Sequence, residues 1–482
     1  MTPSIILLIV ALYFIVLLLV SGMAKRKVDN AGFFSGNRQS RWYMVAFAMI
    51  GAMISGVTYV SVPGMVGKSG FGYLQLIMGF IVGQLIIAFV LTPLFYRMQL
   101  TSVYEYLSNR FGTASYHTGA WFFFISKMLG AAVRLFLVCF TLQILAFEPL
   151  GIPFIINVAV SVGFVWLYTH QGGVKSVIWA DTVKTFCLII SVVLCILFIA
   201  QDMGFNFTGM LQSIEQDPMS KVFFFDNPND KQYFFKQFFA GIFTMIATCG
   251  LDQDMMQRNL SCKNSRESQK NMVISILLQF VVITAFLMLG VLLYQFAALH
   301  GIDSTGDKIF PAIATGGQLP LIVGILFVVG LISSAYNAAG SALTALTTSF
   351  TIDILGMKNS GEDQLGATRK RVHIGMALLM ALVIIVFNVF NSTSVVDAVY
   401  ILASYTYGPI WGMFAFGILT SYQVRDRFIP YVAILSPLLC FVLDKNSEAW
   451  FNGYHFSYEL LILNALFTFV GFCLMSQGKK KA

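Results

Sequence analysis

The chain has 482 residues, of which 57% are hydrophobic and only 11% are charged, with a mean hydropathy of +0.78. So few polar side chains cannot cover the surface of a water-soluble globule of this size. The composition therefore excludes a soluble enzyme or binding domain and predicts an all-α polytopic membrane protein.

Apolar segments long enough to cross a bilayer recur along the whole chain. About 20 apolar residues span the hydrocarbon layer as a helix, and continuous apolar runs do not fit the alternating strands of a membrane barrel. We predict about 13 transmembrane helices, at residues 4–22, 42–66, 72–97, 118–147, 153–169, 176–200, 234–256, 271–298, 318–353, 372–391, 395–421, 427–444 and 458–476.

Basic residues gather in alternate connecting loops and in the tail 479-KKK-481. Because Lys and Arg are enriched in cytoplasmic loops, this asymmetry predicts an outside N-terminus and a cytoplasmic C-terminus in a multi-pass plasma (inner) membrane protein. The net charge of +8 then faces anionic lipid and requires no nucleic-acid partner. The first segment lacks a basic start and a small-residue cleavage site, so we expect it to remain as an anchor.

Catalytic and metal-binding patterns are absent from the sequence. The seven Cys lie mostly inside predicted spans without paired spacing, and the five His are scattered. No nucleophile or phosphate-loop motif is present. We therefore expect no enzyme activity, no cofactor and no obligatory protein partner, but a lipid bilayer and a small-molecule solute as the partners.

The stretch 47-FAMIGAMISGVTYVSVPGMVGKSG-70 combines helix-breaking residues with hydroxyls inside an apolar span. We expect this helix to unwind near its middle, because Gly and Pro weaken the backbone ladder and unwound backbone at membrane depth lines binding sites. The alternative is that the small residues only allow close helix packing.

A second interrupted segment, 237-QFFAGIFTMIATCGLDQDMMQRNL-260, follows about five spans later. Paired broken helices in corresponding positions indicate an inverted-repeat transporter with its site at the midplane. The predicted organisation is an extra helix with a basic loop, a first repeat, an outer loop, a second repeat, and two further helices with a basic tail: residues 1–30, 31–201, 202–233, 234–421 and 422–482.

Four phrases carry a family resemblance: 101-TSVYEYLSNRFG-112, 172-GGVKSVIWADTVKT-185, 250-GLDQDMMQRNL-260 and 334-SAYNAAGSALTALTTSFTIDIL-355. In this order they resemble the sodium/solute symporter family, which includes sodium-coupled glucose, proline and sialic acid transporters. The resemblance implies a LeuT-type five-plus-five inverted repeat with two broken helices. It also implies import of a small polar solute driven by sodium.

The resemblance further implies a sodium site built from two helices. Backbone carbonyls of Gly51 and Ile54 match the first helix, while Asn337 and Ala338 stand where the family has two adjacent hydroxyl residues. Ser333 and Ser334 lie one turn earlier. Sodium prefers oxygen ligands, and the Ala338 side chain supplies none, so the site departs from the family pattern.

Asp181 matches the family's aspartate beside the sodium site, and Lys184 stands where the family usually has glutamine. The two residues share a helix face. We consider two interpretations: the Lys184 ammonium replaces the coupling ion, or it pairs with Asp181 or extends toward the cytoplasmic water.

Arg134 lies deep in an apolar span and resembles the arginine with which sialic acid transporters hold the substrate carboxylate. An internal salt bridge or a water-filled vestibule is the alternative. Ser55 and Thr58 keep the Ser-x-x-Thr spacing of the sialic acid members, and Gln75 offers a further amide. Thr248 stands where sugar-binding members carry an aromatic ring, which favours a carboxylated solute over a hexose.

Asp252, Asp254 and Arg258 close the seventh span, and we expect them to form an inner-gate ion-pair network, with Lys127 at the cytoplasmic edge. The sequence thus predicts a secondary transporter that imports a small, carboxylated organic solute with sodium. The rivals are a proton-coupled or ion-independent transporter that relies on Lys184, a sodium/sugar symporter, and a transporter-like nutrient sensor.

Overall fold

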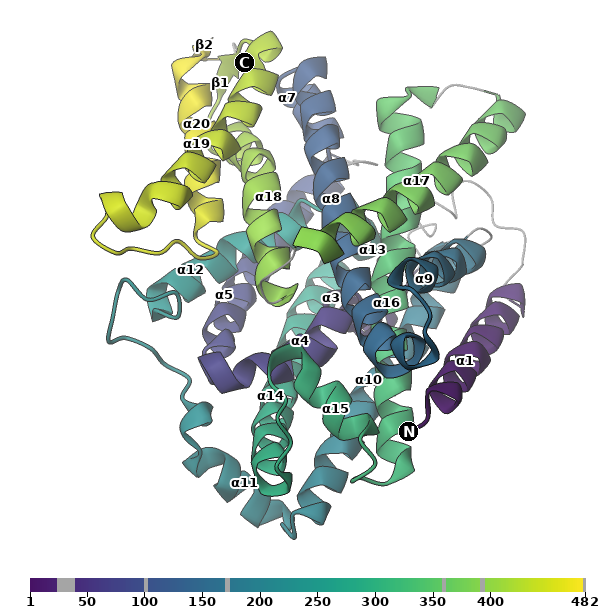
Figure 1. Cartoon of the computed structure of the whole chain (residues 1–482). Coiled ribbons are helices and arrows are strands. Elements are labelled where there is room, and N and C mark those ends of the chain that lie inside the picture. The colour runs from purple at the N-terminus through teal and green to yellow at the C-terminus, as the bar shows by residue number, and fades with distance from the viewer. Residues whose placement is uncertain (24–39, 99–102, 170–173, 358–360, 391–394, 480–482) are drawn as a thin grey trace.

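The computed structural model describes residues 1–23, 40–98, 103–169, 174–357, 361–390 and 395–479, and it is almost entirely helical (Figure 1). Side chains at a few further positions, including 174–184 and 337, lie outside the described part. The only strands in the described ranges form one short antiparallel pair, β1 (Tyr422–Val424) with β2 (Ser476–Lys479).

The helices follow one another through short connections. In the first half of the chain they are α1 (Pro3–Met23), α3 (Trp42–Met53), α4 (Gly56–Ser69), α5 (Tyr73–Ile86), α6 (Thr92–Arg97), α7 (Glu105–Arg110), α8 (Thr113–Leu142), α9 (Phe154–Thr169), α10 (Val174–Asp202) and α11 (Phe207–Gln216). The second half contains α12 (Phe234–Met245), α13 (Gln253–Leu260), α14 (Ser265–His300), α15 (Ile309–Thr315), α16 (Leu321–Ser349), α17 (Glu362–Phe390), α18 (Val395–Leu419), α19 (Ile429–Trp450) and α20 (Leu460–Leu474). Short 3-10 or π turns complete the set: η2 (Ile87–Leu91), η3 (Gln143–Phe147), η4 (Glu148–Leu150), η5 (Pro218–Ser220), η6 (Ile246–Gly250), η7 (Gly306–Lys308), η8 (Phe350–Ile354) and η10 (Asp426–Phe428).

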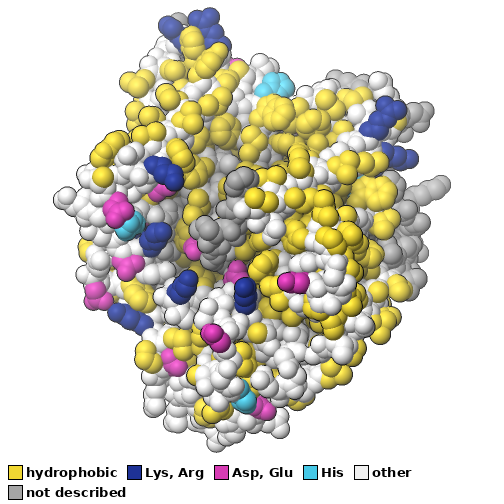
Figure 2. Space-filling view, viewed as in Figure 1, with side chains coloured by type: hydrophobic (Ala, Val, Ile, Leu, Met, Phe, Trp, Pro, Cys, Tyr) yellow, Lys and Arg dark blue, Asp and Glu magenta, His cyan; other side chains and the backbone are white. Residues whose placement is uncertain are grey.

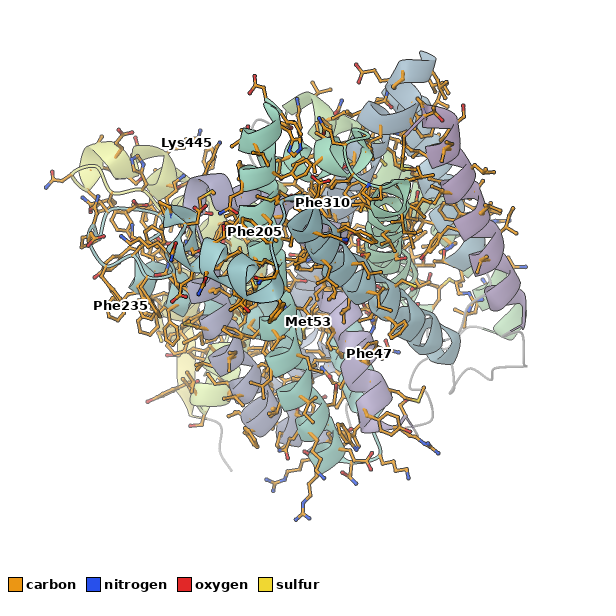
Figure 3. The ribbon with its side chains drawn as sticks, turned by 90° about the horizontal axis from the view of Figure 1, so that it is seen from below. Phe47, Met53, Phe205, Phe235, Phe310 and Lys445 are labelled. Atoms are coloured by element: carbon orange, nitrogen blue, oxygen red, sulfur yellow. The ribbon has the colours of Figure 1, made fainter. Side chains whose placement is uncertain are left out.

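The first predicted break is present between α3 and α4, whose axes differ by 58°. Ile54 and Ser55 both adopt extended backbone angles there, so the last turn of α3 cannot continue into α4. The final carbonyls of α3 consequently lack helical partners and are free to bind other groups. Figure 3 shows Met53, the last residue of α3, near the middle of the molecule.

The second break separates η6 from α13, and the bend is 70°. It falls at Leu251 and Asp252, at the charged exit of the predicted segment. The Asp252 side chain accepts a hydrogen bond from the Met255 amide and so caps α13. A carboxylate at this position is favoured because a helix begins with unpaired N–H groups.

The described helices confirm most predicted spans without confirming their exact number. Seven are long and apolar enough to cross a membrane, or nine if each bent pair is one span, and three shorter apolar helices add to them. Four helices extend beyond the predicted spans by five residues or more: α8 begins at Thr113 against 118, α14 at Ser265 against 271 and α17 at Glu362 against 372, while α19 ends at Trp450 against 444. In each case polar residues form the end of a helix that projects beyond the apolar segment.

The helices pack around the two breaks. The most extensive helix contacts join α5 with α12, α18 with α20, α10 with α16, and α8 with α18. We call the end of the molecule with β1, β2 and α7 the tail end and the opposite end, near α11, the loop end (Figure 1). In Figure 2, hydrophobic side chains cover broad areas, while many charged ones gather at the lower left.

Candidate functional site

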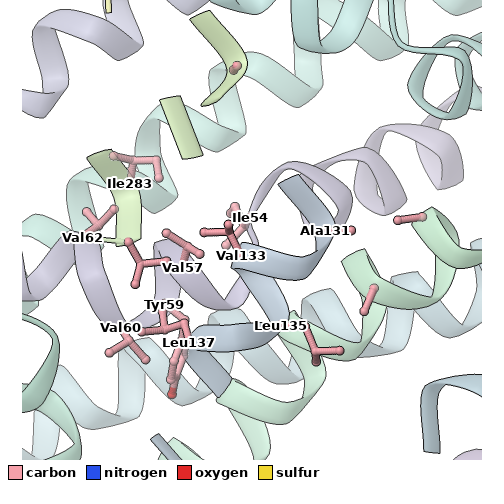
Figure 4. Close-up of a cluster of buried hydrophobic side chains, with 14 of the residues drawn as sticks. Ile54, Val57, Tyr59, Val60, Val62, Ala131, Val133, Leu135, Leu137 and Ile283 are labelled. Atoms are coloured by element: carbon pink, nitrogen blue, oxygen red, sulfur yellow. The ribbon is translucent and has the colours of Figure 1, made fainter. Parts of the chain in front are cut away.

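The break between α3 and α4 packs against the middle of α8. Figure 4 draws Ile54 and Val57 beside Val133, all of them buried in the hydrophobic core. Arg134 follows Val133 directly on α8. The sequence thus places a guanidinium on a core helix, one residue after a position that packs against the first break (Figure 4).

Arg134 is partly exposed and makes no hydrogen bond or salt bridge with any residue that the structure describes. It lies within electrostatic reach of Tyr73, Tyr400 and Tyr407, which come from α5 and α18. An internal salt bridge, the alternative considered from the sequence, is not present among the described residues. The guanidinium keeps its five N–H donors for another acceptor.

The Ser55 and Thr58 hydroxyls come from the break itself and from the first turn of α4. Both side chains are buried, 5% and 8% exposed, and neither has a hydrogen-bond partner among the described residues. Thr248, in η6, donates its hydroxyl to the Thr244 carbonyl at 2.9 Å. Hydroxyl groups therefore accompany both breaks, but of these three only those of the first break are without partners among the described residues.

Gln75 is not available to a solute in this structure, which corrects the prediction made for it. Its amide nitrogen donates to the Gln232 carbonyl at 2.9 Å and its amide oxygen accepts from the Phe224 amide at 3.1 Å. The side chain is 0% exposed. Gln75 therefore fastens the long loop before α12 onto the start of α5.

A charged network lies on the tail side of Arg134. Lys127, seven residues before Arg134 on α8, binds Asp252 at 3.0 Å and Asp254 at 3.3 Å. The Tyr407 hydroxyl donates to the same Asp252 carboxylate at 2.9 Å. Lys127 is only 6% exposed, and its burial is possible because two carboxylates neutralise it.

Arg258 joins this network through Asp254, which lies one helical turn earlier on α13. The Arg258 Nε atom is 3.5 Å from the Asp254 Oδ1 atom. The structure thus brings together the three residues that the sequence singled out for an inner gate. The Tyr104 hydroxyl also donates to the Leu251 carbonyl at 2.8 Å and so ties the second break to the motif 101–112.

The predicted ion site lies where α3, α10 and α16 pack against one another. The Ser333 hydroxyl on α16 is fully buried without a hydrogen-bond partner, and Ser334 donates to the Leu331 carbonyl at 2.8 Å. An orphan oxygen here and the free carbonyl ends of α3, which include Gly51 and Ile54, suit a hard cation. Ala338 is buried and adds no oxygen from its side chain.

The side chains of Asp181, Lys184 and Asn337 lie outside the described residues. The backbone of α10, the helix that carries Asp181 and Lys184, is described, so the positions of these two residues along the helix are known. Position 184 precedes Ser191 by seven residues, two helical turns. Ser191 is buried and hydrogen-bonds the Tyr59 hydroxyl of α4 at 3.0 Å, so position 184 lies on the face of α10 that turns toward the first broken helix.

Sequence reasoning missed the tyrosines around Arg134. The hydroxyls of Tyr73 and Tyr400 hydrogen-bond each other at 2.7 Å on the loop side, while Tyr407 binds Asp252 on the tail side. Tyr400 and Tyr407 are seven residues apart on α18, which places them on one helix face. The seven-residue spacing could have indicated that the two tyrosines share a helix face, but aromatic residues are so common in apolar helices that the signal is weak.

Comparisons with curated proteins agree with this arrangement. A sodium-coupled monocarboxylate transporter 2 from Bos taurus is 23% identical over 82% of this chain and 64% of its own length. The sodium/sialic acid symporter NanT from Aliivibrio fischeri is 24% identical over 82% of this chain and 79% of its own. The chain spans about half to two thirds of the length of the monocarboxylate transporters that it matches, 53% for the human one.

Solved structures show the same fold. A Na⁺-coupled sialic acid symporter in a substrate-bound outward-open state superposes with a TM-score of 0.80 at 18% identity, covering 98% of this chain and 99% of that one. Mhp1, a nucleobase-cation-symport-1 family transporter, gives 0.57 at 12% identity, covering 92% and 94%. The fold is the LeuT fold, as expected. The model of the sodium:solute symporter family matches residues 33–424, and the chain belongs to that family.

Proposed function

We propose that the protein imports a small carboxylated organic solute together with sodium, and that Arg134 binds the carboxylate of the solute. One observation carries the proposal: the Arg134 guanidinium on the core helix α8, near Tyr73, Tyr400 and Tyr407, has no anionic partner among the described residues. A charge at this depth is costly unless it is paired. A carboxylate is the natural acceptor because it matches the planar fork of arginine with two parallel hydrogen bonds.

The Ser55 and Thr58 hydroxyls supply the next contacts. They lack partners among the described residues and come from the first break, on the helix that packs against α8. Two hydroxyls suit the oxygen atoms of a hydroxy or keto acid. The relatives support an anionic solute, since they include monocarboxylate, sialic acid and iodide transporters.

The arrangement also supports alternating access. The Lys127–Asp252–Asp254 network and Tyr407 close the tail side of Arg134, and the Tyr73–Tyr400 hydrogen bond lies on its loop side. Import requires these two closures to open in turn. We place the tail end in the cytoplasm and the N-terminus outside, in the plasma membrane, as the loop charges predict.

Sodium is the coupling ion in this proposal. The orphan Ser333 hydroxyl and the terminal carbonyls of α3 support it. The missing side-chain oxygen at Ala338 reduces the donor set, and we expect a weaker sodium affinity than a full set of hydroxyls would give.

Uptake into proteoliposomes tests this function. Radiolabelled lactate, pyruvate, sialic acid, proline and glucose are each offered with an inward sodium gradient or with potassium alone. We expect sodium-dependent uptake of an acid and its loss in Arg134→Ala. Arg97→Ala, which removes the same charge from the exposed end of α6, is the matched control and should transport normally. Uptake of glucose alone, or full activity of Arg134→Ala, would refute the proposal.

A proton-coupled or ion-independent mechanism is the second candidate. The observation in its favour is that position 184 lies on the face of α10 that turns toward α4, while Ala338 lacks a ligand atom. In this mechanism the Lys184 ammonium replaces sodium. Uptake driven by an imposed proton gradient without sodium, and abolished in Lys184→Gln, would establish it. Sodium-driven uptake that survives Lys184→Gln would exclude it.

A further inference from the structure

The helix α18 carries both Tyr400 and Tyr407. A proline, Pro409, follows the two tyrosines before the helix ends at Leu419. Pro409 has no N–H, so the carbonyl of Tyr405, four residues earlier, loses its helical hydrogen bond. The proline ring also crowds that carbonyl. Without another donor, this turn of α18 would hold an unsatisfied backbone oxygen inside the membrane, which costs free energy.

Asn464 of α20 supplies the missing donor. Its side-chain nitrogen donates to the Tyr405 carbonyl at 3.0 Å and to the Ser404 carbonyl at 2.9 Å. Asn464 is 0% exposed. One amide group thus satisfies the carbonyl that Pro409 leaves free and the carbonyl preceding it.

The Asn464 side chain is itself held in place. The Ser436 hydroxyl of α19 lies 2.6 Å from both the backbone and the side-chain oxygen of Asn464. On the other side, Gly408 leaves the space that the Asn464 side chain fills, because a Cβ at Gly408 would overlap it. The amide is therefore fixed between three helices, α18, α19 and α20.

The tail end of α18 is anchored independently. The Arg110 guanidinium donates to the carbonyls of Gly417 at 3.3 Å, Thr420 at 2.9 Å and Tyr422 at 2.8 Å. Gly412 lies directly against α20, because a Cβ there would overlap Thr468. The part of α18 after Pro409 is thus fastened to α7 and α20. Before the proline, the Tyr405 hydroxyl donates to Asp444 of α19 at 3.0 Å and Asp397 accepts from the Tyr458 hydroxyl, just before α20.

We propose that Asn464 is a positioning residue that supports a hinge in α18 at Pro409 and thereby holds Tyr400 and Tyr407 on either side of Arg134. The loop-end half of α18 moves about this turn when Tyr400 leaves Tyr73 and Asp397 leaves Tyr458, while the tail-end half stays anchored. The helices α19 and α20, which lie outside the five-plus-five repeat, gain a role in gating. The inference depends on the fold and on transport by the family, and it does not depend on the identity of the solute.

A spectroscopic distance measurement tests the hinge without any solute. Spin labels at Ile401→Cys on α18 and Leu299→Cys on α14, both at exposed positions, report the movement of the loop-end half. Exposed Cys473 and half-buried Cys187 are first replaced by Ser. In liposomes, Asn464→Leu should broaden the label-to-label distance distribution relative to the parent, because the freed turn no longer fixes the direction of α18.

Pro409→Ala provides the rescue. It restores an N–H that can donate to the Tyr405 carbonyl, so the double variant Asn464→Leu/Pro409→Ala should return the distribution to the parental width. Ser436→Ala keeps the Asn464 amide as the donor but removes the hydroxyl that holds the Asn464 side chain in place. It should broaden the distribution less than Asn464→Leu. Asn446→Leu is the matched control, since Asn446 bonds only the Val442 carbonyl of its own helix among the described residues.

Two outcomes overturn the inference. One is a parental distance distribution in Asn464→Leu, which would show that the amide does not position α18. The other is a double variant that stays as broad as Asn464→Leu, which would mean that Asn464 does not act through the carbonyl freed by Pro409. If Asn464→Leu fails to fold, the reading rests on Ser436→Ala, where an unbroadened distribution overturns the proposal.

Discussion

The two sides of the central arginine are closed by different chemistry. On the tail side, the buried ammonium of Lys127 binds two aspartates, and Tyr407 binds one of them. On the loop side, two neutral phenols, Tyr73 and Tyr400, share a single hydrogen bond. A buried ion pair is costly to break because each partner left alone is a buried charge, whereas a phenol pair costs about 1 kcal/mol. The tail-side closure should therefore be the harder one to open.

This difference suits an importer. A solute that arrives from the loop side meets the weaker closure, while the stronger closure prevents a leak to the tail side until the site is filled. The anionic solute and the coupling cation can then contribute the energy that separates Lys127 from its aspartates, since a ligand shifts an equilibrium by its differential affinity for the two states.

The largest effect is expected for Asp252→Ala, which breaks the tail-side network. Lys127 loses its closest partner, Tyr407 loses its acceptor and α13 loses its cap, so we expect a loss of stability of about 3–5 kcal/mol. Thermal unfolding in detergent measures it, and a solute leak into liposomes reports the opened gate. Asp226→Ala, which removes the exposed partner of Lys221, should change neither. Equal effects of the two variants would contradict the comparison.

The next largest effect is expected for Gly64→Ala on the loop side. A Cβ at Gly64 would overlap the carbonyl oxygen of Gly306 in η7, and backbone cannot move aside as a flexible side chain does. We expect a destabilisation of about 1–3 kcal/mol, measured by the same unfolding assay. Gly163→Ala on α9, where nothing lies within 4 Å, is the control. A neutral Gly64→Ala would mean that η7 and α4 are not closely packed.

A smaller effect is expected for Tyr400→Phe, which removes one hydroxyl from the loop-side pair. The hydrogen bond to Tyr73 is worth about 0.5–1.5 kcal/mol. Its loss should favour the state that is open on the loop side, and should raise the rate at which a cysteine-reactive reagent, added to the solution, reaches the region around Arg134. A double-mutant cycle with Tyr73→Phe isolates the pair. Tyr431→Phe, at an exposed position on α19, should have no effect, and additive effects of the two central variants would rule out coupling.

The smallest effect concerns pH at the loop end. Burial raises the pKa of Glu459, just before α20, above its ordinary value of 4.5. A raised pKa means that folding favours the protonated carboxyl, so this stabilisation is complete below pH 4.5 and is lost as the pH rises through the shifted value. Unfolding temperatures measured from pH 4 to 8 should decline less in Glu459→Gln than in the parent. An identical decline would show that Glu459 is not responsible.

Much of this fold was accessible from the sequence because its signals are local. Apolar length predicted the spans, and Gly, Pro and hydroxyl residues in one segment predicted the first break. Charged residues at the end of another segment predicted Asp252, Asp254 and Arg258 as a network. A membrane makes such departures from apolar character expensive and therefore easy to recognise.

The errors arose where distant segments decide the environment. Gln75 looked like a free amide, but residues 224 and 232, about 150 positions later, cover it. The pairing of Lys127 was not predictable either, because its partners Asp252 and Asp254 lie on another segment more than 120 residues later. Asn464 gave no signal and Tyr400 only a weak one, since a tyrosine or an asparagine in an apolar helix gains meaning mainly from the carbonyl or hydroxyl that it meets.

The binding of a carboxylate at Arg134 is the central claim, and one measurement tests it most directly. Affinities of the transported acid and of its uncharged amide are compared in the parent and in Arg134→Ala by isothermal titration in saturating sodium. We expect the parent to prefer the acid by about 10-fold to 100-fold, as a charge-assisted bond worth 1.5–3 kcal/mol implies, and Arg134→Ala to lose that preference. An unchanged preference for the acid in Arg134→Ala would contradict the account.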